Sequence, residues 1–209
     1  MPIISKSTRA AMSHLSKNDA VLAILIKRFG PFDIKPHQNY YKELVNSIIS
    51  QQLSVKAAYT IQTRFVNLFG DSNVFPTPED ILKKSPEDIR SAGLSTSKIN
   101  YIRDLAEHII DGRLKLYHLI NLPNESVIEE LIAVKGIGEW TAHMFLIFSI
   151  GRLDVLPTGD LGIKNGVKAL YNLPGKPDAK DIVKISDINN WHPYESVACW
   201  YIWKSLDNE

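Results

Sequence analysis

The chain has 209 residues, 44% of them apolar, which is enough for a packed core in one large domain or two small ones. Its formal net charge of +1 gives no global sign of nucleic acid, so any nucleic-acid-binding face must be a local patch. The single cysteine, Cys199, excludes an internal disulfide and a four-cysteine iron–sulfur cluster. No signal-peptide pattern and no run of about 18 apolar residues occurs, so we expect an intracellular protein without membrane contact.

Apolar residues recur at helical spacing in many segments, and no segment shows the alternation of a half-buried strand. We therefore predict an all-α fold with about ten helices. Two stretches, 29–38 and 151–159, lack the helical pattern and separate the middle of the chain from its ends. This predicts a middle domain at 38–155 and a discontinuous second domain formed by 1–37 and 156–209.

Most of the predicted helices follow a Ser, Thr, Asp or Asn that can cap their first turn, for example Ser16, Ser54 and Asn124. In chain order the helices are expected at 8–14, 17–28, 40–51 and 55–69, after Thr77 and after Ser85, from Ser95 or Ser97 to 110, and at 125–133, 141–150, 161–170, 178–186 and 193–206.

The sequence VKGIGEWTA at 134–142 lies between two of these helices. Gly136 and Gly138 allow a tight turn with positive φ, and they let a phosphate approach backbone N–H groups at the start of the second helix. This pattern is a helix-hairpin-helix, which contacts the DNA backbone without reading base sequence. An ordinary helical hairpin with glycine caps would fit the same residues.

Asp160 directly precedes the predicted helix 161–170, at the boundary between the two predicted domains, where ligand sites concentrate. The simplest interpretation of Asp160 is a helix N-cap. A catalytic role is compatible with it, because a helix N-terminus favours the ionised form of a carboxylate.

Four sequence blocks occur in a fixed order: IISQQLSVKAA, VKGIGEWTA, DVLPTGDLGIKNGV and WHPYESVACWYIW. Together they resemble the 3-methyladenine DNA glycosylase II family, within the helix-hairpin-helix base-excision glycosylase superfamily, from about residue 38 to the C-terminus. The resemblance implies a two-lobed, all-helical DNA glycosylase fold with a cleft between the lobes. It implies a monomer that binds double-stranded DNA with a damaged base or an abasic site, in the nucleus of a eukaryote or the cytoplasm and nucleoid of a prokaryote.

The activity implied by the resemblance is hydrolysis of the N-glycosidic bond of alkylated purines, such as 3-methyladenine and 7-methylguanine. Asp160 matches the catalytic aspartate of the superfamily, which stabilises a sugar with oxocarbenium character while it orients or deprotonates water. Members that also cut the strand carry a Schiff-base lysine where this chain has Trp140. We therefore expect a monofunctional enzyme without lyase activity.

An aromatic base pocket is implied as well, because an electron-rich ring face attracts a positively charged alkylated purine. By resemblance this pocket consists of Trp140, Trp203, Tyr41 and Met144. Met144 stands where some members have a tyrosine, which leaves the range of excised bases open.

A flipped base leaves a gap in the duplex, and the resemblance assigns the residue that fills it to the turn after IIS. Gln52 is the candidate wedge, with Gln51 and Leu53 beside it, because amides there can hydrogen-bond to orphaned base edges from the minor groove. The alternative is a polar turn that faces solvent.

The hairpin is expected to bind the DNA backbone through Lys135, Gly136, Gly138 and Thr141. Lys135 is either a phosphate contact or a solvated lysine. The family commonly binds a monovalent cation through backbone carbonyls that here belong to Ile132, Val134 and Ile137, so a structural Na⁺ or K⁺ is expected there unless the amides and Lys135 suffice. No other cofactor is expected.

Two other functions fit parts of the sequence. A lesion- or abasic-site-binding protein with little or no excision activity would keep the same scaffold. A helix-hairpin-helix module for protein–protein contacts would explain the hairpin, but it would give no reason for Asp160, the wedge turn or the aromatic residues.

Overall fold

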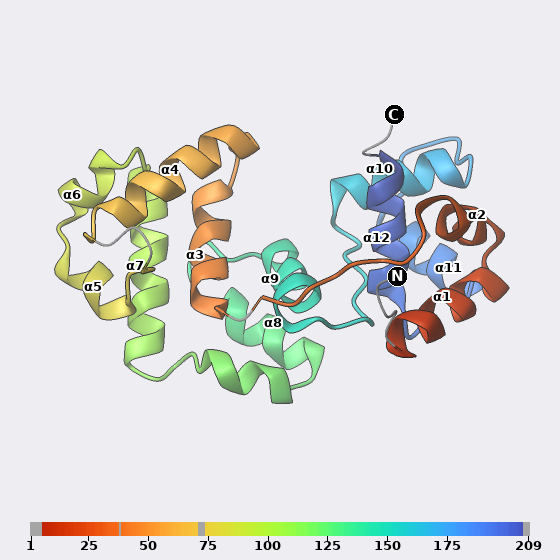
Figure 1. Cartoon of the computed structure of the whole chain (residues 1–209), viewed down its shortest axis with the longest axis horizontal. Coiled ribbons are helices and arrows are strands. Elements are labelled where there is room, and N and C mark those ends of the chain that lie inside the picture. Colours follow the sequence, from red (N-terminus) through yellow and green to blue (C-terminus); the bar gives the residue numbers. More distant parts are fainter. Residues whose placement is uncertain (1–5, 38, 71–73, 207–209) are drawn as a thin grey trace. The chain divides into compact units, whose positions relative to one another are not determined.

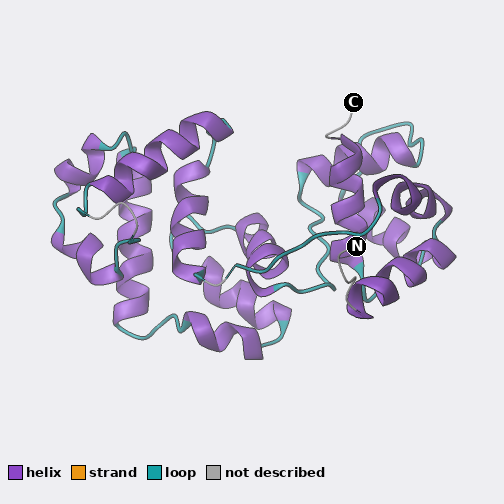
Figure 2. Cartoon of the chain, in the orientation of Figure 1, coloured by secondary structure: helices purple, strands orange, loops and turns teal. Residues whose placement is uncertain are grey.

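The computed structural model describes residues 6–37, 39–70 and 74–206, and all regular structure in these ranges is helical (Figure 2). The α-helices are α1 (Lys6–Asn18), α2 (Ala20–Phe29), α3 (Tyr40–Ser50), α4 (Val55–Asn67), α5 (Pro78–Lys83), α6 (Pro86–Ser91), α7 (Thr96–Ile110), α8 (Asn124–Ile132), α9 (Glu139–Phe145), α10 (Leu161–Leu170), α11 (Ala179–Ile188) and α12 (Glu195–Leu206). A 3₁₀ segment, η1 (Leu116–Asn121), precedes α8, and a π-helical segment, η2 (Leu146–Ile150), continues α9. The predicted all-α fold is confirmed.

One compact unit combines the described residues up to Pro36 with those from Leu146 onward. In it α1 packs on α2, and α12 packs on both α2 and α10 (Figure 1). Its fully buried side chains come from both ends of the chain: Leu15, Leu22, Ile163, Val167, Trp191, Tyr201 and Ile202. The N-terminal helices are therefore held by the C-terminal ones through a shared hydrophobic core.

The second compact unit runs from His37 to Phe145. Within it α3 packs on α4, α7 and α9, while α7 also contacts α5 and α6, and α8 packs on α9 (Figure 1). The buried face of α3 consists of Leu44, Val45, Ile48 and Ile49. Because α3 contacts both α7 and α9, the turn at its C-terminal end and the hairpin before α9 belong to one packed body.

The boundary between the units lies ten residues before the position that the sequence predicted, at 145 instead of 155. Residues 146–155 belong to the first unit, in which Leu153 and Val155 are hydrogen-bonded to Ser196 at the start of α12. Ser196 donates its N–H to the Leu153 carbonyl at 2.9 Å, and its Oγ accepts the Val155 N–H at 3.0 Å. The cleft predicted between the lobes stays a prediction.

Several predicted helix starts need correction, and α1 and α12 begin at Lys6 and Glu195 instead of at residues 8 and 193. Asp19, not Ser16, caps α2, because its carboxylate accepts the first N–H groups of that helix while Ser16 lies inside α1. Asn124 is the first residue of α8 and makes no cap. The helix after the hairpin begins at Glu139, two residues before the predicted Thr141.

Asp19 is a buried carboxylate that joins distant parts of the first unit. It is 1% exposed, and it accepts N–H groups of α2 at 2.8 and 3.0 Å, the Tyr171 hydroxyl at 2.5 Å and the Trp191 indole N–H at 2.7 Å. Burial, together with the bond to Asp19, raises the pKa of Tyr171. One carboxylate thus accepts the N–H groups at the start of α2, the buried Trp191 indole N–H and the partly buried Tyr171 hydroxyl.

Candidate functional site

Asp160 follows a tight turn and caps α10. Its N–H donates to the Pro157 carbonyl at 3.0 Å, and its Oδ1 accepts the N–H of Ile163 at 2.8 Å. The same Oδ1 accepts the indole N–H of Trp203 at 2.9 Å, from the last turns of α12. Asp160 is 7% exposed, so the carboxylate is held on one side by a helix N-terminus and on another by an aromatic donor.

Trp203 lies between the carboxylate and a second ring. Its ring centroid is 5.8 Å from that of Phe148, with 36° between the planes. A β-carbon built on Gly162 would lie 3.1 Å from both the Asp160 Oδ1 and the Trp203 Cδ1. The absence of a side chain at Gly162 therefore lets the first turn of α10 approach the Asp160–Trp203 pair closely.

Cys199 lies one turn before Trp203 on α12 and is fully buried. Burial raises the pKa of its thiol, and the negative charges of Asp160 and Glu195 raise it further. A thiol in these surroundings stays protonated and unreactive. Of these two groups, Asp160 is the one suited to acid–base or electrostatic chemistry.

The two hairpin glycines have different roles. Gly136 has φ of +84°, and a β-carbon there would lie 2.2 Å from the ring of Tyr101. Gly138 is exposed, does not have a positive φ, and would place a β-carbon more than 4 Å from any heavy atom outside its chain neighbours and its own helix. Gly136 is thus required by the fold, whereas Gly138 leaves open space in front of the start of α9.

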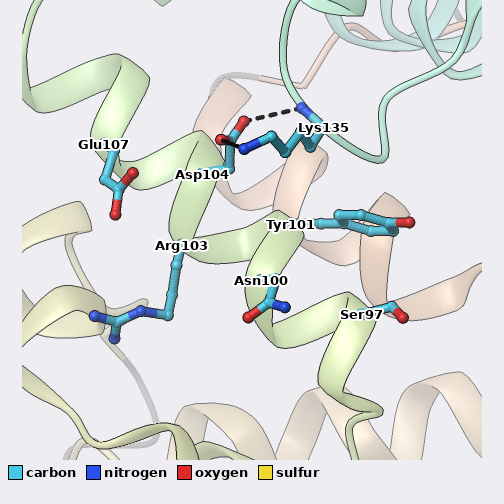
Figure 3. A pocket seen from close by; sticks show the side chains of 7 residues that line it. All are labelled: Ser97, Asn100, Tyr101, Arg103, Asp104, Glu107 and Lys135. Atoms are coloured by element: carbon cyan, nitrogen blue, oxygen red, sulfur yellow. Dashed lines mark hydrogen bonds and ion pairs between the residues drawn. The ribbon is translucent and has the colours of Figure 1, made fainter.

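Lys135 is already paired within the protein. Its backbone N–H donates to the Asp104 Oδ2 at 2.9 Å, and its Nζ lies 3.3 Å from the Asp104 Oδ1 (Figure 3). Burial works against the charged carboxylate, but the bonds from Lys135 outweigh it and lower the pKa of Asp104. A phosphate at this point would share the Lys135 ammonium with a carboxylate.

An open polar pocket of about 370 Å³ lies beside this pair, mostly on α7 (Figure 3). It is lined by Ser97, Asn100, Tyr101, Arg103, Asp104, Glu107 and Lys135. Its charges have both signs, and Arg103 donates to the carbonyls at the end of α5. Two of the lining residues hold the hairpin in place from α7: the Tyr101 ring lies against Gly136, and Asp104 binds Lys135.

The predicted wedge residues form a type II β-turn. Leu53 donates its N–H to the Ser50 carbonyl at 3.1 Å, Gln51 has φ −50° and ψ 128°, and Gln52 has φ +57°. The position of Gln52 in such a turn favours glycine, so a glutamine there costs conformational energy. Strain of this kind at an exposed polar residue is typical of functional sites.

Gln51 and Gln52 differ in orientation. The Gln51 Nε2 donates to the Gly136 carbonyl at 2.8 Å, which ties the turn to the hairpin. Gln52 is exposed, and Leu53 is 37% exposed. Gln52 is therefore the better placed of the two amides to enter a duplex, with Leu53 beside it.

On α9, Trp140 is 50% exposed and Met144 is partly exposed one turn later, so the two lie on one face of the helix. Thr141 is 5% exposed, and its contact with the DNA backbone stays a prediction. For Trp140 and Met144, and for Trp203 on α12, contact with the base stays a prediction.

Tyr41, in the first turn of α3, packs against Phe75. Its ring meets Phe75 edge-on at 6.0 Å, and burial, with smaller effects of Glu79 and Asp80, raises its pKa. Its neighbour Tyr40 instead packs edge-on against Phe145 of α9 at 5.3 Å. The structure therefore brings Tyr40 against α9, and the role predicted for Tyr41 stays a prediction.

The carbonyls predicted to bind a monovalent cation lie around the hairpin turn. The Val134 carbonyl accepts the Ile137 N–H at 3.1 Å, and Ile132 ends α8. In the described part of the chain no cluster of three or more His, Cys, Asp or Glu is suited to bind a metal. None of its helices is long and apolar enough to span a membrane.

Three α7 side chains of the site were not predicted: Lys98, Tyr101 and Asp104. Lys98 bonds to the carbonyl of Gln51, 47 residues away, and Asp104 to the N–H of Lys135, 31 residues away. In the sequence they are ordinary helix residues, and no local pattern marks their distant partners.

Comparison with known proteins identifies the family. Residues 45–188 match the family model described as HhH-GPD superfamily base excision DNA repair protein. The chain is 37% identical over 206 residues to DNA-3-methyladenine glycosylase 1 of Schizosaccharomyces pombe, a match that covers 97% of this chain and 89% of that protein.

Two solved structures are similar over almost the whole chain. One is the S. pombe 3-methyladenine DNA glycosylase Mag1 in complex with abasic DNA, with a TM-score of 0.81, 38% identity, and coverage of 95% of this chain and 97% of that one. The other is a DNA-3-methyladenine glycosidase from Bacillus halodurans, with a TM-score of 0.84, 41% identity, and coverage of 95% and 89%. The family resemblance of the four sequence blocks is thereby confirmed: the chain belongs to the HhH-GPD superfamily of base excision DNA repair proteins.

Proposed function

We propose that this protein is a DNA glycosylase that hydrolyses the N-glycosidic bond of alkylated purines in double-stranded DNA, of the 3-methyladenine and 7-methylguanine type, and leaves an abasic site. The observation that carries the proposal is the Asp160 carboxylate, held by the N-terminus of α10 and by the Trp203 indole. The names of the relatives that match along nearly the whole chain support the substrate class.

The chemistry requires little beyond one carboxylate. An alkylated purine carries positive charge and leaves as a neutral base with the electron pair of the glycosidic bond, so no general acid is needed at the leaving group. Asp160 stabilises the cationic sugar and accepts the proton of the water that adds to it. The ring of Trp203, bonded to Asp160, offers an aromatic face to a cationic base beside that carboxylate.

DNA backbone binding is assigned to the hairpin. Gly138 is exposed and leaves room for a phosphate at the start of α9, whereas the Lys135 ammonium is paired with Asp104. The Val134 carbonyl accepts one turn hydrogen bond and has a second lone pair, which is compatible with a bound Na⁺ or K⁺ that also contacts the Ile132 and Ile137 carbonyls. One hairpin and one carboxylate per chain suffice, so the proposed active form is a monomer.

Gly138→Val is expected to weaken binding to any duplex by about tenfold or more, because its side chain occupies the space of a phosphate without disturbing the fold. Fluorescence anisotropy at constant ionic strength in sodium, potassium and a bulky organic cation measures both this loss and the need for an ion. Gly175→Val is the matched control, because Gly175 is also exposed with open space around it. Affinity that is indifferent to the cation and to Gly138→Val would exclude the hairpin as the DNA anchor.

The product is expected to be an intact abasic site that breaks only after alkali, since Trp140 stands where strand-cutting relatives carry a Schiff-base lysine. The test incubates the protein with methylated duplex under single-turnover conditions, with and without borohydride. A borohydride-trapped covalent complex would contradict the absence of lyase activity. Tight binding to an abasic duplex without base release would instead favour a damage-binding protein with little excision activity.

A further inference from the structure

Lys98, in the first turn of α7, caps the C-terminal end of α3. Its Nζ donates to the Ile49 carbonyl at 2.7 Å and to the Gln51 carbonyl at 2.7 Å. Its side chain is partly buried, and this burial lowers the pKa of the ammonium. A cation bonded to carbonyls at a helix C-terminus also interacts favourably with the negative end of the helix dipole.

The second of these bonds fixes the peptide that joins Gln51 to Gln52. A type II turn differs from the commoner type I turn mainly in the orientation of this central peptide, which is rotated by roughly half a turn. With Gln51 at ψ 128° and Gln52 at φ +57°, the carbonyl of that peptide points to Lys98. The charged hydrogen bond from Lys98 therefore stabilises the type II orientation of this peptide, which forces Gln52 into the positive φ that is unfavourable for a residue other than glycine.

A second hydrogen bond connects the same turn to the hairpin. The Gln51 Nε2 donates to the carbonyl of Gly136, whose α-carbon lies against the Tyr101 ring. Tyr101 lies one turn after Lys98 on α7, so one helix supports both the wedge turn and the hairpin. The main chain of Gln52 is thus fixed in position, while its side chain is exposed.

We propose that Lys98 is a positioning residue for the wedge: it holds the Gln51–Gln52 peptide in the type II orientation and so aims the Gln52 side chain at the gap left by a flipped base. The proposal rests on the proposed function, because a wedge is needed only by a protein that opens the duplex. Lys98 acts through Gln52 and does not touch the base or the sugar. Its removal lowers affinity for opened DNA and leaves affinity for undamaged DNA unchanged.

The first experiment needs no DNA. Hydrogen exchange of the Leu53 amide, which donates to the Ser50 carbonyl, reports on the turn in the free protein. Lys98→Met is expected to speed this exchange at least fivefold. It should also change the three-bond coupling between the amide and α protons of Gln52 to a value typical of negative φ. Lys98→Arg, which keeps a cationic donor, should restore slow exchange, and Lys184→Met, at an exposed lysine of α11, should change nothing. Unchanged exchange and coupling in Lys98→Met would overturn the proposal.

The second experiment is a double-mutant cycle on affinity for abasic and undamaged duplexes. Lys98→Met and Gln52→Ala are each expected to weaken binding to abasic DNA about tenfold and to undamaged DNA less than twofold. The double variant should bind abasic DNA no more weakly than Gln52→Ala, because both changes remove one interaction. Additive losses, or equal losses on both duplexes, would mean that Lys98 does not act through Gln52.

The two experiments also separate this proposal from the proposed function. If the wild-type protein neither releases bases nor prefers abasic DNA, the proposed function fails, while the exchange of the Leu53 amide still decides whether Lys98 holds the turn. If the wild type is active and Lys98→Met leaves both the exchange and the abasic affinity unchanged, only the role of Lys98 fails.

Discussion

Asp160→Asn is expected to lower single-turnover base release from methylated duplex by at least about a hundredfold while most of the DNA affinity remains. The asparagine oxygen can still accept the N–H of Ile163 and the indole of Trp203, so the local geometry persists and only the negative charge is lost. The charge is what stabilises the cationic sugar, so the effect belongs to the chemical step. Base release is measured at saturating protein, together with affinity for an abasic duplex.

Asp178→Asn is the matched control for this variant. Asp178 caps α11 as Asp160 caps α10, accepting the Asp181 N–H at 2.9 Å, but it lies on the surface. Both variants should therefore lose a similar, small amount of stability as helix caps. If the two variants release bases at the wild-type rate, Asp160 is a structural cap and the enzymatic proposal loses its catalytic residue.

Asp19→Ala is expected to lower the free energy of unfolding by about 3 to 7 kcal/mol. The change removes a helix cap, which contributes about 1 kcal/mol. It also leaves the buried Trp191 indole N–H and the partly buried Tyr171 hydroxyl without their acceptor, at about 1 to 3 kcal/mol each. Because Asp19 joins α2 to the C-terminal part of the chain, the loss of stability should be confined to the first unit. Urea unfolding followed by tryptophan fluorescence measures it.

The comparison for Asp19→Ala is Asp178→Ala, which removes an exposed cap alone and should cost only about 1 kcal/mol. A loss for Asp19→Ala no larger than this would show that the bonds to Tyr171 and Trp191 add nothing to stability. DNA affinity per folded molecule should stay at the wild-type level, because Asp19 lies in the core of its unit and not at the hairpin or the wedge turn.

Local sequence determined the helices and many of their ends. Ser54, Thr77, Ser85 and Asp160 cap the predicted helices because a short polar side chain accepts a backbone N–H three residues ahead. Such signals need only a few neighbouring residues. The family blocks added the position of the candidate catalytic aspartate and of the wedge turn, since both lie within short motifs.

Tertiary structure alone decided which side chains these motifs meet. Asp104 reaches Lys135 across 31 residues, and Lys98 reaches Gln51 across 47. In the first unit, Leu153 and Val155 bond to Ser196. From the sequence Gly136 and Gly138 are equivalent. In the structure the Tyr101 ring leaves no room for a side chain at Gly136, whereas Gly138 has open space around it. Periodicity and capping report the backbone hydrogen bonds and the buried face of one helix, whereas the partners of a charged side chain depend on how separate helices pack.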